Sequence, residues 1–394
     1  MKKNKLNIAL VHPLLDMYGG AERQILNLLD ELIKKGHNVT LYTYFYDEKN
    51  CYPNLVKKLK KNIVSVSDHS SIFLKQKYLS VFFPFFFYKI YKKMKKGHLI
   101  INCHNPPSYF SAFLYKKINT KAKIFWMFNE LSPWHRFPLR NWWKLNKLFF
   151  YPIKLIYLYT ERKIVESVDN IIVLDRKNKK IVKDTFNRDS IVVHTGFEKK
   201  EVDKEIKNKI IDRYKLKNKK VILTVSKLEP LKRIDDFIRS FLKLKNKNVI
   251  GIIGGSGSEL NNLKKLIKKL NLSERIIFTG SLSEDELAAL YEISYIFVFP
   301  AVKQTWGLAP VEAMSYGKPA VISSDAGVSE IIKNKENGFI FEAKSVSSLV
   351  KNINYLLNNK KMYEKISKNA RDTVFKELSW EKYSQNILEI FARN

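Results

Sequence analysis

Short runs of β-branched residues alternate with longer helical patterns along most of this 394-residue chain. The first series consists of NIALV, then AERQILNLLDELIKKG, then NVTLYTY, which is typical of a strand, a helix and a second strand. A strand, helix and strand in this order form a βαβ unit, and repeated units build a parallel sheet that helices cover. The alternation therefore predicts an α/β fold.

The alternation is interrupted once, by a stretch rich in lysine and glutamate at residues 198–220, and then starts again. The later strand-like runs are VILTVS, VIGIIGG, RIIFTG, YIFVFP and PAVIS. Compact α/β domains usually hold about 100 to 200 residues, so one core does not suffice for this length. We expect one Rossmann-like domain at residues 1–197 and a second at 198–378. A C-terminal helix at 379–394 is expected to pack back on the first domain.

The chain is strongly basic, because its 71 Lys and Arg residues outnumber 38 Asp and Glu residues and give a formal net charge of +33. This charge favours anionic partners, a class that includes nucleic acids, phosphorylated substrates and acidic lipid surfaces. A nucleic-acid-binding protein is disfavoured, since no compact binding motif occurs and the basic residues are spread over both halves.

Cysteine use and the apolar runs favour a cytoplasmic protein. Cys51 and Cys103 have neither the spacing of metal ligands nor that of a disulfide pair. His12 and Pro13 end the apolar run near the start, which predicts a strand there instead of a leader peptide. The longest apolar stretch, at 78–91, is interrupted by a proline and a lysine and is too short to span a bilayer.

Two loops in the second half have residues suited to an anionic ligand. SKLEPLKR follows VILTVS and places Lys227 and Lys232 at the carboxyl end of a strand, where open α/β sheets bind ligands. IIGGSGSEL places Gly254 between a strand and a helix, where the backbone can approach a ligand. The alternatives are solvated lysines and an ordinary tight turn. The loop lacks the dinucleotide-binding fingerprint, which disfavours a nicotinamide enzyme.

The most specific pattern lies at residues 300–342, in the run PAVKQTWGLAPVEAMSYGKPAVISSDAGVSEIIKNKENGFIFE. This run resembles the donor-site signature of glycosyltransferase family 4, a family of retaining enzymes with the GT-B fold. In that family two glutamates eight positions apart bracket a Phe-Gly-Leu-like turn, and Glu-Ala-Met and Gly-x-Pro-Val follow. This chain has Trp306-Gly307-Leu308, then Glu312 with Ala-Met after it, then Gly-Lys-Pro-Ala, in the same order.

The resemblance covers most of the chain. SKLEPLKR resembles the family's Gly-Arg-Leu-x-x-x-Lys phosphate loop, with Ser226 and Lys227 in place of Gly and Arg. Gly19 and Gly20 lie in GGAE, which resembles the glycine-rich turn that approaches the donor, and His104 lies in CHNPPS, which resembles a His-x-Pro segment near the donor sugar. The resemblance implies two Rossmann-like domains facing each other across a cleft. It also implies metal-independent transfer of a hexose-type sugar, with retained configuration, from a UDP- or GDP-linked donor to a saccharide acceptor.

The chain departs from the family at one position, where Gln304 replaces the first of the two spaced glutamates. Glutamine keeps the length and an acceptor oxygen, but it loses the charge and adds two donor hydrogens. A charged catalytic role at this position is therefore excluded, and orientation of the sugar through hydrogen bonds is the expected role. The alternatives are a shifted donor preference and weak activity.

The physical chemistry of the reaction fits the remaining residues. A nucleotide diphosphate gains negative charge as the glycosidic bond breaks, and Lys227, Lys232 and the backbone amides around Gly307 and Leu308 are suited to stabilise it. Glu312 is expected to accept hydrogen bonds from the vicinal hydroxyls of a ribose. Its alternative role is that of a helix-start glutamate stabilised by the helix dipole.

No cofactor is expected. Neither Asp47-Glu48 nor Glu284-Asp285 forms a carboxylate site of the kind that binds Mg²⁺. No conventional nucleophile pair is visible, so we expect front-side attack in which the departing phosphate assists deprotonation of the acceptor. His104 is expected near the donor sugar, and its alternative is a satisfied polar group beside a strand end. A nucleotide-sugar epimerase, which would share the donor site, is the alternative enzyme.

Two segments of the first half interleave aromatic residues with lysine and arginine, at 82–96 and 134–154. This mixture suits an anionic membrane surface, where aromatic rings lie at headgroup depth and cations meet lipid phosphates. The alternative is a pair of ordinary core helices with solvated faces. The membrane interpretation predicts a lipid-linked saccharide acceptor and a peripheral location on the inner face of the membrane.

Overall fold

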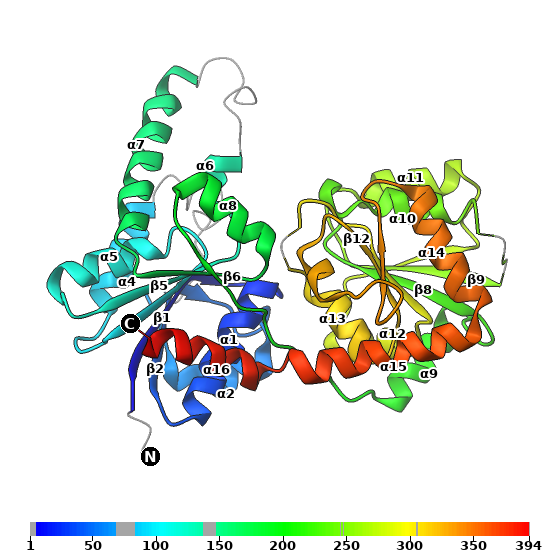
Figure 1. Ribbon diagram of the computed structural model, residues 1–394, viewed down its shortest axis with the longest axis horizontal. Coiled ribbons are helices and arrows are strands. Elements are labelled where there is room, and N and C mark those ends of the chain that lie inside the picture. Colours follow the sequence, from blue (N-terminus) through cyan, green and yellow to red (C-terminus); the bar gives the residue numbers. More distant parts are fainter. Residues whose placement is uncertain are drawn as a thin grey trace. The chain divides into compact units, whose positions relative to one another are not determined.

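The computed structural model describes residues 5–67, 83–136, 147–244, 246, 248–304 and 306–393. The chain forms two compact units: unit 1 consists of Met1–Gly196 with Trp380–Asn394, and unit 2 consists of Phe197–Ser379. Each unit contains one sheet with helices packed on it, so the α/β class predicted from the alternation is confirmed (Figure 1).

Unit 1 contains a seven-stranded sheet in the order β3-β2-β1-β4-β5-β6-β7, in which all paired strands are parallel. Strands buried on both faces require nearly continuous apolar runs, which explains segments such as NVTLYTYFY. The strands are β1 (Asn7–Leu15), β2 (Asn38–Tyr46), β3 (Ile63–Ser65), β4 (Ile100–His104), β5 (Lys123–Phe128), β6 (Asn170–Val173) and β7 (Ile191–Val192). The helices are α1 (Gly20–Lys34), α2 (Pro53–Leu59), η1 (Lys60–Asn62), α4 (Phe83–Lys93), α5 (Tyr109–Ile118), α6 (Pro133–Arg136), α7 (Lys147–Glu166), α8 (Arg176–Phe186) and α16 (Trp380–Ala392).

Unit 2 contains a six-stranded parallel sheet in the order β10-β9-β8-β11-β12-β13. Its strands are β8 (Lys220–Val225), β9 (Val249–Gly254), β10 (Ile276–Gly280), β11 (Ile296–Phe299), β12 (Ala320–Ser323) and β13 (Phe339–Phe341). Its helices are α9 (Lys204–Arg213), η4 (Pro230–Lys232), α10 (Ile234–Ser240), α11 (Leu260–Lys269), α12 (Glu284–Ile293), α13 (Leu308–Ser315), η5 (Gly327–Ile331), α14 (Val346–Asn358) and α15 (Lys360–Glu377). The order changes direction between β8 and β11, and open α/β sheets bind ligands outside the carboxyl ends of strands at such a point.

The C-terminal helix α16 is part of unit 1, although unit 2 precedes it in the chain. It packs on α1, and the ring of Phe391 lies 4.6 Å from that of Phe125 in β5. Trp380, Tyr383 and Ile387 of this helix are buried. The chain therefore leaves unit 1 after Gly196 and returns to it after unit 2 is complete.

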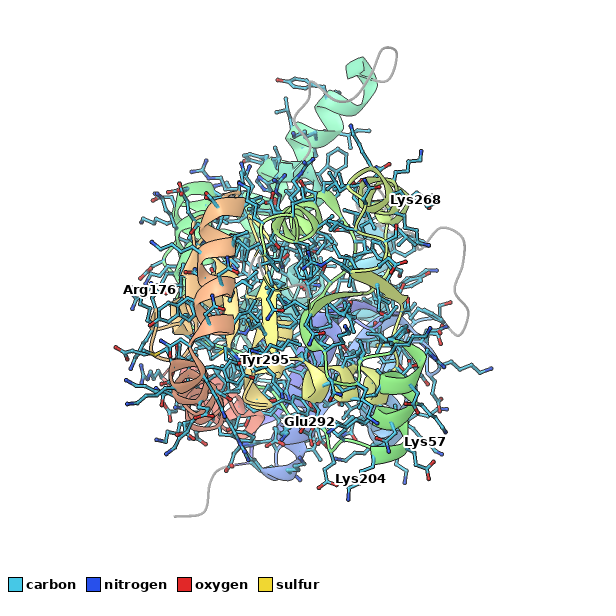
Figure 2. All side chains as sticks on the ribbon, turned by 90° about the vertical axis from the view of Figure 1, so that its right-hand side faces the viewer. Lys57, Arg176, Lys204, Lys268, Glu292 and Tyr295 are labelled. Carbon is cyan, nitrogen blue, oxygen red and sulfur yellow. The ribbon has the colours of Figure 1, made fainter. Side chains whose placement is uncertain are left out.

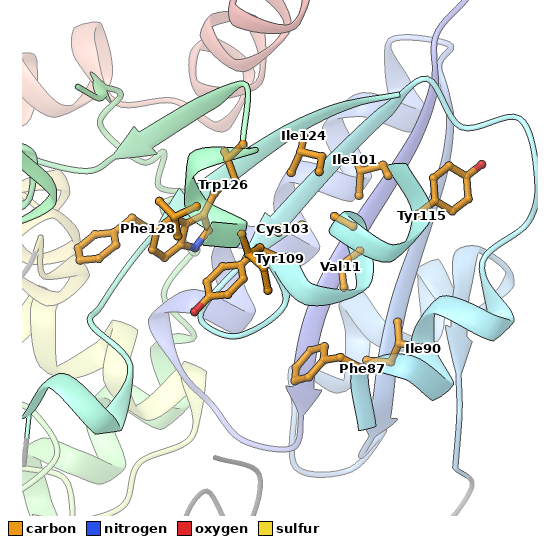
Figure 3. Packing of buried hydrophobic residues seen from close by; sticks show 14 of the residues in the cluster. Val11, Phe87, Ile90, Ile101, Cys103, Tyr109, Tyr115, Ile124, Trp126 and Phe128 are labelled. Carbon is orange, nitrogen blue, oxygen red and sulfur yellow. The ribbon is translucent and has the colours of Figure 1, made fainter. Parts of the chain in front are cut away.

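The core of unit 1 is rich in aromatic side chains where α5 meets the sheet (Figure 3). Trp126 of β5 is fully buried, and its ring lies 4.9 Å from Tyr109 and 5.3 Å from Phe128 in edge-on contacts. Such contacts add to the stabilisation that burial of large apolar surfaces provides. The start of α5 is thereby fixed against β5.

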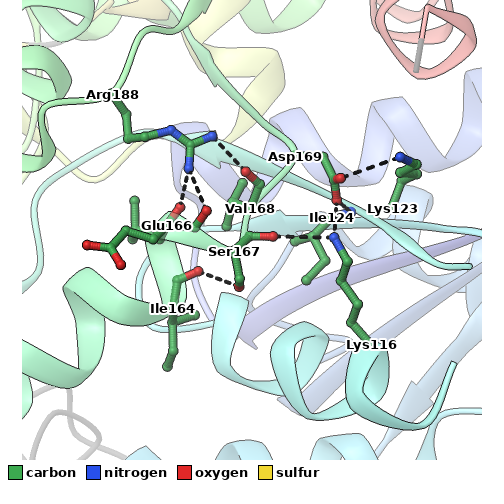
Figure 4. Close-up of polar contacts among 10 residues, drawn as sticks. Lys116, Lys123, Ile124, Ile164, Glu166, Ser167, Val168, Asp169 and Arg188 are labelled. Carbon is green, nitrogen blue, oxygen red and sulfur yellow. Dashed lines mark hydrogen bonds and ion pairs between the residues drawn. The ribbon is translucent and has the colours of Figure 1, made fainter. Parts of the chain in front are cut away.

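Polar contacts fix the C-terminal end of α7 (Figure 4). Arg188 donates hydrogen bonds to the carbonyl oxygens of Val165, Glu166 and Val168 at 2.7–2.9 Å. Helix C-termini leave carbonyl groups without partners inside the helix, and a cation satisfies them and favours the helix dipole. Directly after the helix, the carboxylate of Asp169 accepts from the backbone amide of Ile124 in β5 at 2.8 Å. The helix is therefore held to the sheet at this end.

Basic side chains extend from both units into solvent (Figure 2). Lys57 and Arg176 are exposed on unit 1, and Lys204 and Lys268 are exposed on unit 2. Within the described residues, no helix combines the length and the apolar composition needed to cross a membrane.

Candidate functional site

The loops that follow β8 and β9 run side by side at the carboxyl edge of the unit 2 sheet. The amide of Ser226 donates to the carbonyl oxygen of Gly254 at 3.1 Å, and the amide of Leu228 donates to that of Ser256 at 2.8 Å. Both loops therefore lie at the edge where open α/β sheets bind ligands.

Glycines make this contact between loops possible. A Cβ atom at Gly255 would lie 2.0 Å from the carbonyl oxygen of Ser226, and one at Gly257 would lie 2.3 Å from that of Leu228. Gly255 also has a φ of +117°, which other residues rarely adopt. At Gly254, the predicted donor-binding glycine, a Cβ atom would lie 2.9 Å from a leucine side chain. These glycines therefore allow the two loops to pack closely, and the expected approach of their backbone to a ligand stays a prediction.

Lys232 and Gln304 meet at this edge from two different loops. Lys232 ends η4, and the carbonyl oxygen of Leu231 accepts a hydrogen bond from the amide of Val302 at 2.9 Å. The Nζ atom of Lys232 donates a hydrogen bond to the Oε1 atom of Gln304. Burial lowers the pKa of Lys232. Two predicted site residues that are 72 positions apart are thus in direct contact.

The loop that contains Gln304 is fixed by its backbone. The amide of Gly327 donates to the carbonyl oxygen of Gln304 at 3.0 Å, and the amide of Val328 donates to that of Trp306 at 3.1 Å. Gly307 then adopts a φ of +103°, and α13 begins at Leu308. Since this φ is strained for residues with a Cβ atom, a glycine is required for the sharp turn into α13. The predicted amides of Gly307 and Leu308 therefore lie at a helix N-terminus, where an anion is favoured.

Glu312 is the fifth residue of α13 and is partly buried. The hydroxyl group of Tyr291 donates to its Oε2 atom at 2.8 Å. Tyr291 is itself buried and stacks on Tyr316 with ring centroids 5.8 Å apart. The carboxylate is therefore held in one orientation by α12, unlike a fully solvated helix-start glutamate.

Lys227 differs from Lys232 in its surroundings. Its side chain is exposed, and its Nζ atom forms an ion pair with Glu229 at 2.9 Å. An exposed pair of this kind contributes little free energy, so an anionic ligand can replace Glu229 as the partner of Lys227.

His104 of unit 1 is the last residue of β4, and its imidazole is fully buried. Its Nε2 atom lies 2.9 Å from the Oδ1 atom of Asn102. Burial, together with the neighbouring His12, holds the pKa of His104 well below its ordinary value. The imidazole is therefore neutral, and its Nδ1 atom has no hydrogen-bond partner among the residues that the structure describes.

Gly19 and Gly20 lie at the start of α1, directly after the loop that follows β1. A Cβ atom at Gly19 would lie 1.9 Å from the Oε2 atom of Glu22, so the glycine makes room for this carboxylate. Burial raises the pKa of Glu22 to about 7, and the charges of Asp16 and Glu130 add to the effect. No motif in the sequence joins these three acids as a group. Asp16 and Glu130 follow β1 and β5 closely, and this position at strand ends is the signal that could have found them.

The two aromatic and basic segments correspond in part to α4, α6 and the start of α7, while residues 82 and 137–146 lie outside the described part of the chain. On α4, Phe85 and Tyr88 are exposed, and the Nζ atom of Lys89 lies 4.3 Å from the centre of the Phe85 ring. In the part of α7 whose side chains are described, from residue 151 on, the exposed large apolar residues are Tyr151, Leu155, Ile156 and Tyr159. Other aromatic residues of these segments, such as Phe86, Phe87 and Trp134, are buried. Core packing and surface exposure thus occur within the same segments.

In the described residues, no group of three or more His, Cys, Asp or Glu side chains is placed to hold a metal ion. The acids Asp16, Glu22 and Glu130 interact electrostatically without forming such a group.

Two family models match the chain, one on each half. Residues 205–373 match Glycosyl transferases group 1, and residues 18–200 match Glycosyltransferase Family 4. Together the two matches include every predicted site residue.

Relatives are found in several organisms. An uncharacterized glycosyltransferase of Methanocaldococcus jannaschii is 31% identical over 175 residues, which cover 44% of this chain and 45% of the relative. An uncharacterized glycosyltransferase of Haemophilus influenzae is 24% identical over 369 residues, which cover 90% of this chain and 91% of the relative. The match to N-acetyl-alpha-D-glucosaminyl L-malate synthase of Bacillus anthracis is 24% identical and covers 42% of this chain. These matches cover 45% of the Methanocaldococcus protein and 43% of the Bacillus protein, so the chain spans less than half the length of each of these two relatives.

Among solved structures, HepE of Anabaena in complex with UDP and glucose has a TM-score of 0.77 and 15% sequence identity, and the match covers 99% of this chain and 100% of that one. A likeness at this level of identity shows a common fold.

Proposed function

Since this chain belongs to the group 1 glycosyltransferases of family 4 and has the GT-B fold, we propose that it transfers a hexose-type sugar from a nucleotide-sugar donor to a saccharide acceptor. Unit 2 binds the donor, and unit 1 binds the acceptor. The nucleotide is UDP or GDP, and the UDP held by the related fold of HepE supports the first of these.

The contact between Lys232 and Gln304, beside the start of α13, is the observation that carries this proposal. It places a cation, an amide and a helix N-terminus at the carboxyl edge of one sheet. A departing nucleoside diphosphate gains negative charge, which fixed cations and backbone amides stabilise best where water is excluded. Lys232 and the amides of Gly307 and Leu308 stabilise this charge. When the donor binds, a phosphate replaces Glu229 as the ion-pair partner of Lys227.

Glu312 accepts hydrogen bonds from the two ribose hydroxyls, while Tyr291 orients its carboxylate. Acidic residues bind ribose in this way in other α/β folds. Gly254 contributes by keeping the loop after β9 close to the phosphate loop. The donor is thus bound at its ribose and at its phosphates by separate groups of unit 2.

Transfer occurs with retention of configuration and without a metal ion. The acceptor oxygen attacks the anomeric carbon on the face from which the diphosphate departs, and the departing phosphate takes the acceptor proton. Gln304 orients the donor sugar through hydrogen bonds, since it has no charge to contribute. His104 acts as a neutral hydrogen-bonding group near the sugar, because its lowered pKa excludes a stable imidazolium. Gly19 and Gly20 form the turn of unit 1 that approaches the donor.

The acceptor is a lipid-linked saccharide, and the protein works in the cytoplasm at the inner face of a membrane. The exposed apolar residues of α4 and α7 and the net charge of +33 support this part of the proposal. Exposed aromatic residues and nearby lysines bind anionic lipid surfaces together.

Calorimetry with UDP, GDP and uridine tests the donor site, and we expect a diphosphate to bind far more tightly than the nucleoside. Radiolabelled nucleotide sugars then test the reaction with and without a crude lipid extract, each in the presence and absence of EDTA. Sugar transfer that needs an acceptor and survives EDTA supports the proposal. Conversion of the donor without an acceptor would instead identify an epimerase, and loss of transfer on chelation would overturn the metal-free mechanism.

A further inference from the structure

Glu161 is a buried carboxylate in α7, and its side chain is only 2% exposed. Its Oε1 atom accepts hydrogen bonds from the hydroxyl group of Tyr109 and, at 3.4 Å, from that of Tyr157. Its Oε2 atom lies 2.6 Å from the Nε2 atom of His135. The donors come from α5, α6 and α7, so three helices meet at one carboxylate.

The hydrogen bonds fix the protonation of the ring nitrogen atoms of His135. Burial raises the pKa of Tyr109 and Tyr157, so both hydroxyl groups stay protonated and donate to Glu161. A carboxylate oxygen only accepts, hence the Nε2 atom of His135 carries the proton toward Glu161. In the neutral imidazole, Nδ1 is then a hydrogen-bond acceptor, and no described residue shares a hydrogen bond with it. The His135 side chain is 20% exposed, which leaves the imidazole between the carboxylate and the solvent.

The surroundings hold this pair of residues rigidly. The ring of Trp134 packs against Tyr157 with centroids 5.6 Å apart, and the ring of His135 meets Phe186 edge-on, also at 5.6 Å. The C-terminal end of α7 is held by Arg188, as Figure 4 shows. Polar binding groups are effective when neighbouring residues fix their orientation in advance.

The pair lies near the carboxyl edge of the unit 1 sheet. His135 is seven residues beyond the end of β5 at Phe128. Between them, the Nδ2 atom of Asn129 donates to the Oδ1 atom of Asn105 at 3.0 Å and thereby joins the loops after β5 and β4. Open α/β sheets bind small molecules at this edge. The pair is therefore placed where unit 1 would hold a ligand.

We propose that His135, oriented by Glu161, binds a hydroxyl group of the saccharide acceptor through its Nδ1 atom. The inference rests on the proposed function and specifies one contact of the acceptor site. A carboxylate bonded to one ring nitrogen of a histidine fixes the tautomer and strengthens the other nitrogen as an acceptor. Such a nitrogen selects an O–H donor.

The carboxylate of Glu161 disfavours a phosphate as the group bound. It lies one imidazole ring away from the Nδ1 atom, so an anion at Nδ1 would meet a second negative charge in a partly buried site. The group bound to His135 is therefore a neutral hydroxyl of the sugar, and the phosphates of a lipid-linked acceptor lie elsewhere.

The test uses the full chain with ¹⁵N-labelled histidine and follows the Nδ1 and Nε2 resonances of His135 by NMR at fixed pH. The resonances of His135 are assigned as those that are missing from the spectrum of the His135→Asn variant. The probes are the methyl glycosides of glucose, galactose, mannose and N-acetylglucosamine, with inorganic phosphate as the anionic probe. We expect at least one glycoside to shift the Nδ1 resonance in a saturable way while Nε2 moves little. Phosphate should have no such effect.

Glu161→Gln is the matched variant, because it keeps the size of the side chain but removes the charge that orients the imidazole. We expect the apparent dissociation constant of the active glycoside to rise roughly tenfold, the loss of about one hydrogen bond. Glu166→Gln is the control, because it makes the same change at an exposed carboxylate of α7 that pairs with Lys163, and it should leave glycoside binding nearly unchanged.

UDP binding measured on the same samples separates this inference from the proposed function. Tight UDP binding without any glycoside effect on His135 would overturn the acceptor contact alone. A shift caused by phosphate but by no glycoside would also overturn it. Absence of UDP and GDP binding together with a saturable glycoside shift would instead overturn the donor site and leave a saccharide-binding site in unit 1.

Discussion

The Nζ atom of Lys232 donates a hydrogen bond to the side-chain oxygen of Gln304, so a partly buried ammonium group is paired with a neutral amide. The family signature that residues 300–342 resemble has a glutamate at this position. With glutamine, the charge of Lys232 is not neutralised by residue 304 and is available to a bound diphosphate. Gln304 is therefore expected to strengthen diphosphate binding, not only to preserve the shape of the site.

Gln304→Glu should lower the affinity for UDP roughly tenfold, because a carboxylate then competes with the diphosphate for Lys232 and repels it. Calorimetric titration of UDP measures the change, and uridine should bind equally well to both proteins. Gln304→Asn is the control, since it breaks the contact without adding a charge. Equal losses of UDP affinity in the two variants would mean that geometry, and not charge, determines binding here.

Lys232→Ala should weaken UDP binding more than Lys227→Ala does. Lys232 is partly buried at the site, whereas Lys227 is exposed and already paired with Glu229. Hydrogen bonds between charged groups contribute about 1.5–3 kcal/mol, and we assign a value in this range to Lys232 and a smaller one to Lys227. Calorimetry with UDP and uridine checks both variants. If uridine affinity falls as much as UDP affinity, the lysines have a structural role and no phosphate contact.

Glu312→Ala should remove the ability of the protein to distinguish UDP from 2′-deoxy-UDP, because the proposed carboxylate contact is to the ribose hydroxyls. Tyr291→Phe keeps the carboxylate but removes the 2.8 Å hydrogen bond that orients it, so part of the discrimination should persist. The measurement is the ratio of the two dissociation constants in each protein. A wild-type ratio that survives in Glu312→Ala would assign the ribose contact to another residue.

Local sequence was sufficient to predict both sheets, because a parallel strand is buried on both faces and needs an apolar run of its own. The runs NIALV and VILTVS correspond to β1 and β8, each paired with parallel neighbours. Membership of the glycosyltransferase family followed from the Trp306-Gly307-Leu308 segment and its neighbours. Apolar runs are enough to predict the strands, and the order of residue types along one loop is enough to indicate the family.

Contacts between distant segments were not predictable in the same way. Lys232 and Gln304 were both expected near a donor, but their hydrogen bond depends on how the amide of Val302 positions one loop against the other. The sequence predicts that the glycines after β9 approach a ligand, but it does not show that they also let the phosphate loop pack against them. The contact between His135 and Glu161 could not be predicted, because a single histidine and a single glutamate form no sequence motif. Only the packing of α6 and α7 brings the two side chains together.

Glu22→Gln should stabilise the protein at alkaline pH and leave its stability nearly unchanged in acid. The folded-state pKa of Glu22 is raised by burial to about 7, above its ordinary 4.5. The stability that its bound proton provides is thus complete below pH 4.5 and is lost as the pH rises through about 7. A shift of this size corresponds to up to about 3 kcal/mol in the free energy of unfolding. Urea unfolding of both proteins at pH 4.5 and 8.5 measures the difference.

The difference in the free energy of unfolding between the variant and the unmodified protein is taken at each pH. This difference cancels the contribution of other titrating groups. His12 and His98, whose pKa burial lowers to about 4, affect the stability of both proteins equally. A stabilisation of Glu22→Gln that is the same at both pH values would show that the carboxyl group does not titrate near neutrality.

Among the side chains of helix α7 that the structure describes, four large apolar ones are exposed to solvent. Tyr151, Leu155 and Tyr159 are spaced by four residues and therefore lie on one face, and Ile156 is beside them. Tyr159 and Ile156 are 67% and 66% exposed. In Figure 1 the N-terminal half of α7 extends beyond the other helices of unit 1. Large exposed apolar residues in a row are uncommon on a surface that meets only water.

We therefore expect the full chain to bind vesicles that contain phosphatidylserine and not vesicles of phosphatidylcholine alone, as a flotation assay measures. Replacing Tyr151, Leu155 and Tyr159 together with serine should abolish most of this binding. Leu242→Ser is the control, because Leu242 is an exposed apolar residue of unit 2 with 52% exposure. Salt should weaken the association, since interactions of exposed charges are screened within about 8 Å at physiological ionic strength.

The possible outcomes of flotation separate the two physical contributions. Equal binding to both kinds of vesicle, or binding that salt does not affect, would indicate apolar adhesion without a role for the net charge of +33. Binding that persists in the triple variant would exclude α7 and direct attention to the exposed Phe85 and Tyr88 of α4. Absence of binding to either vesicle would contradict the membrane proposal and make a water-soluble saccharide the better acceptor, because nothing would then bring the protein to a lipid surface.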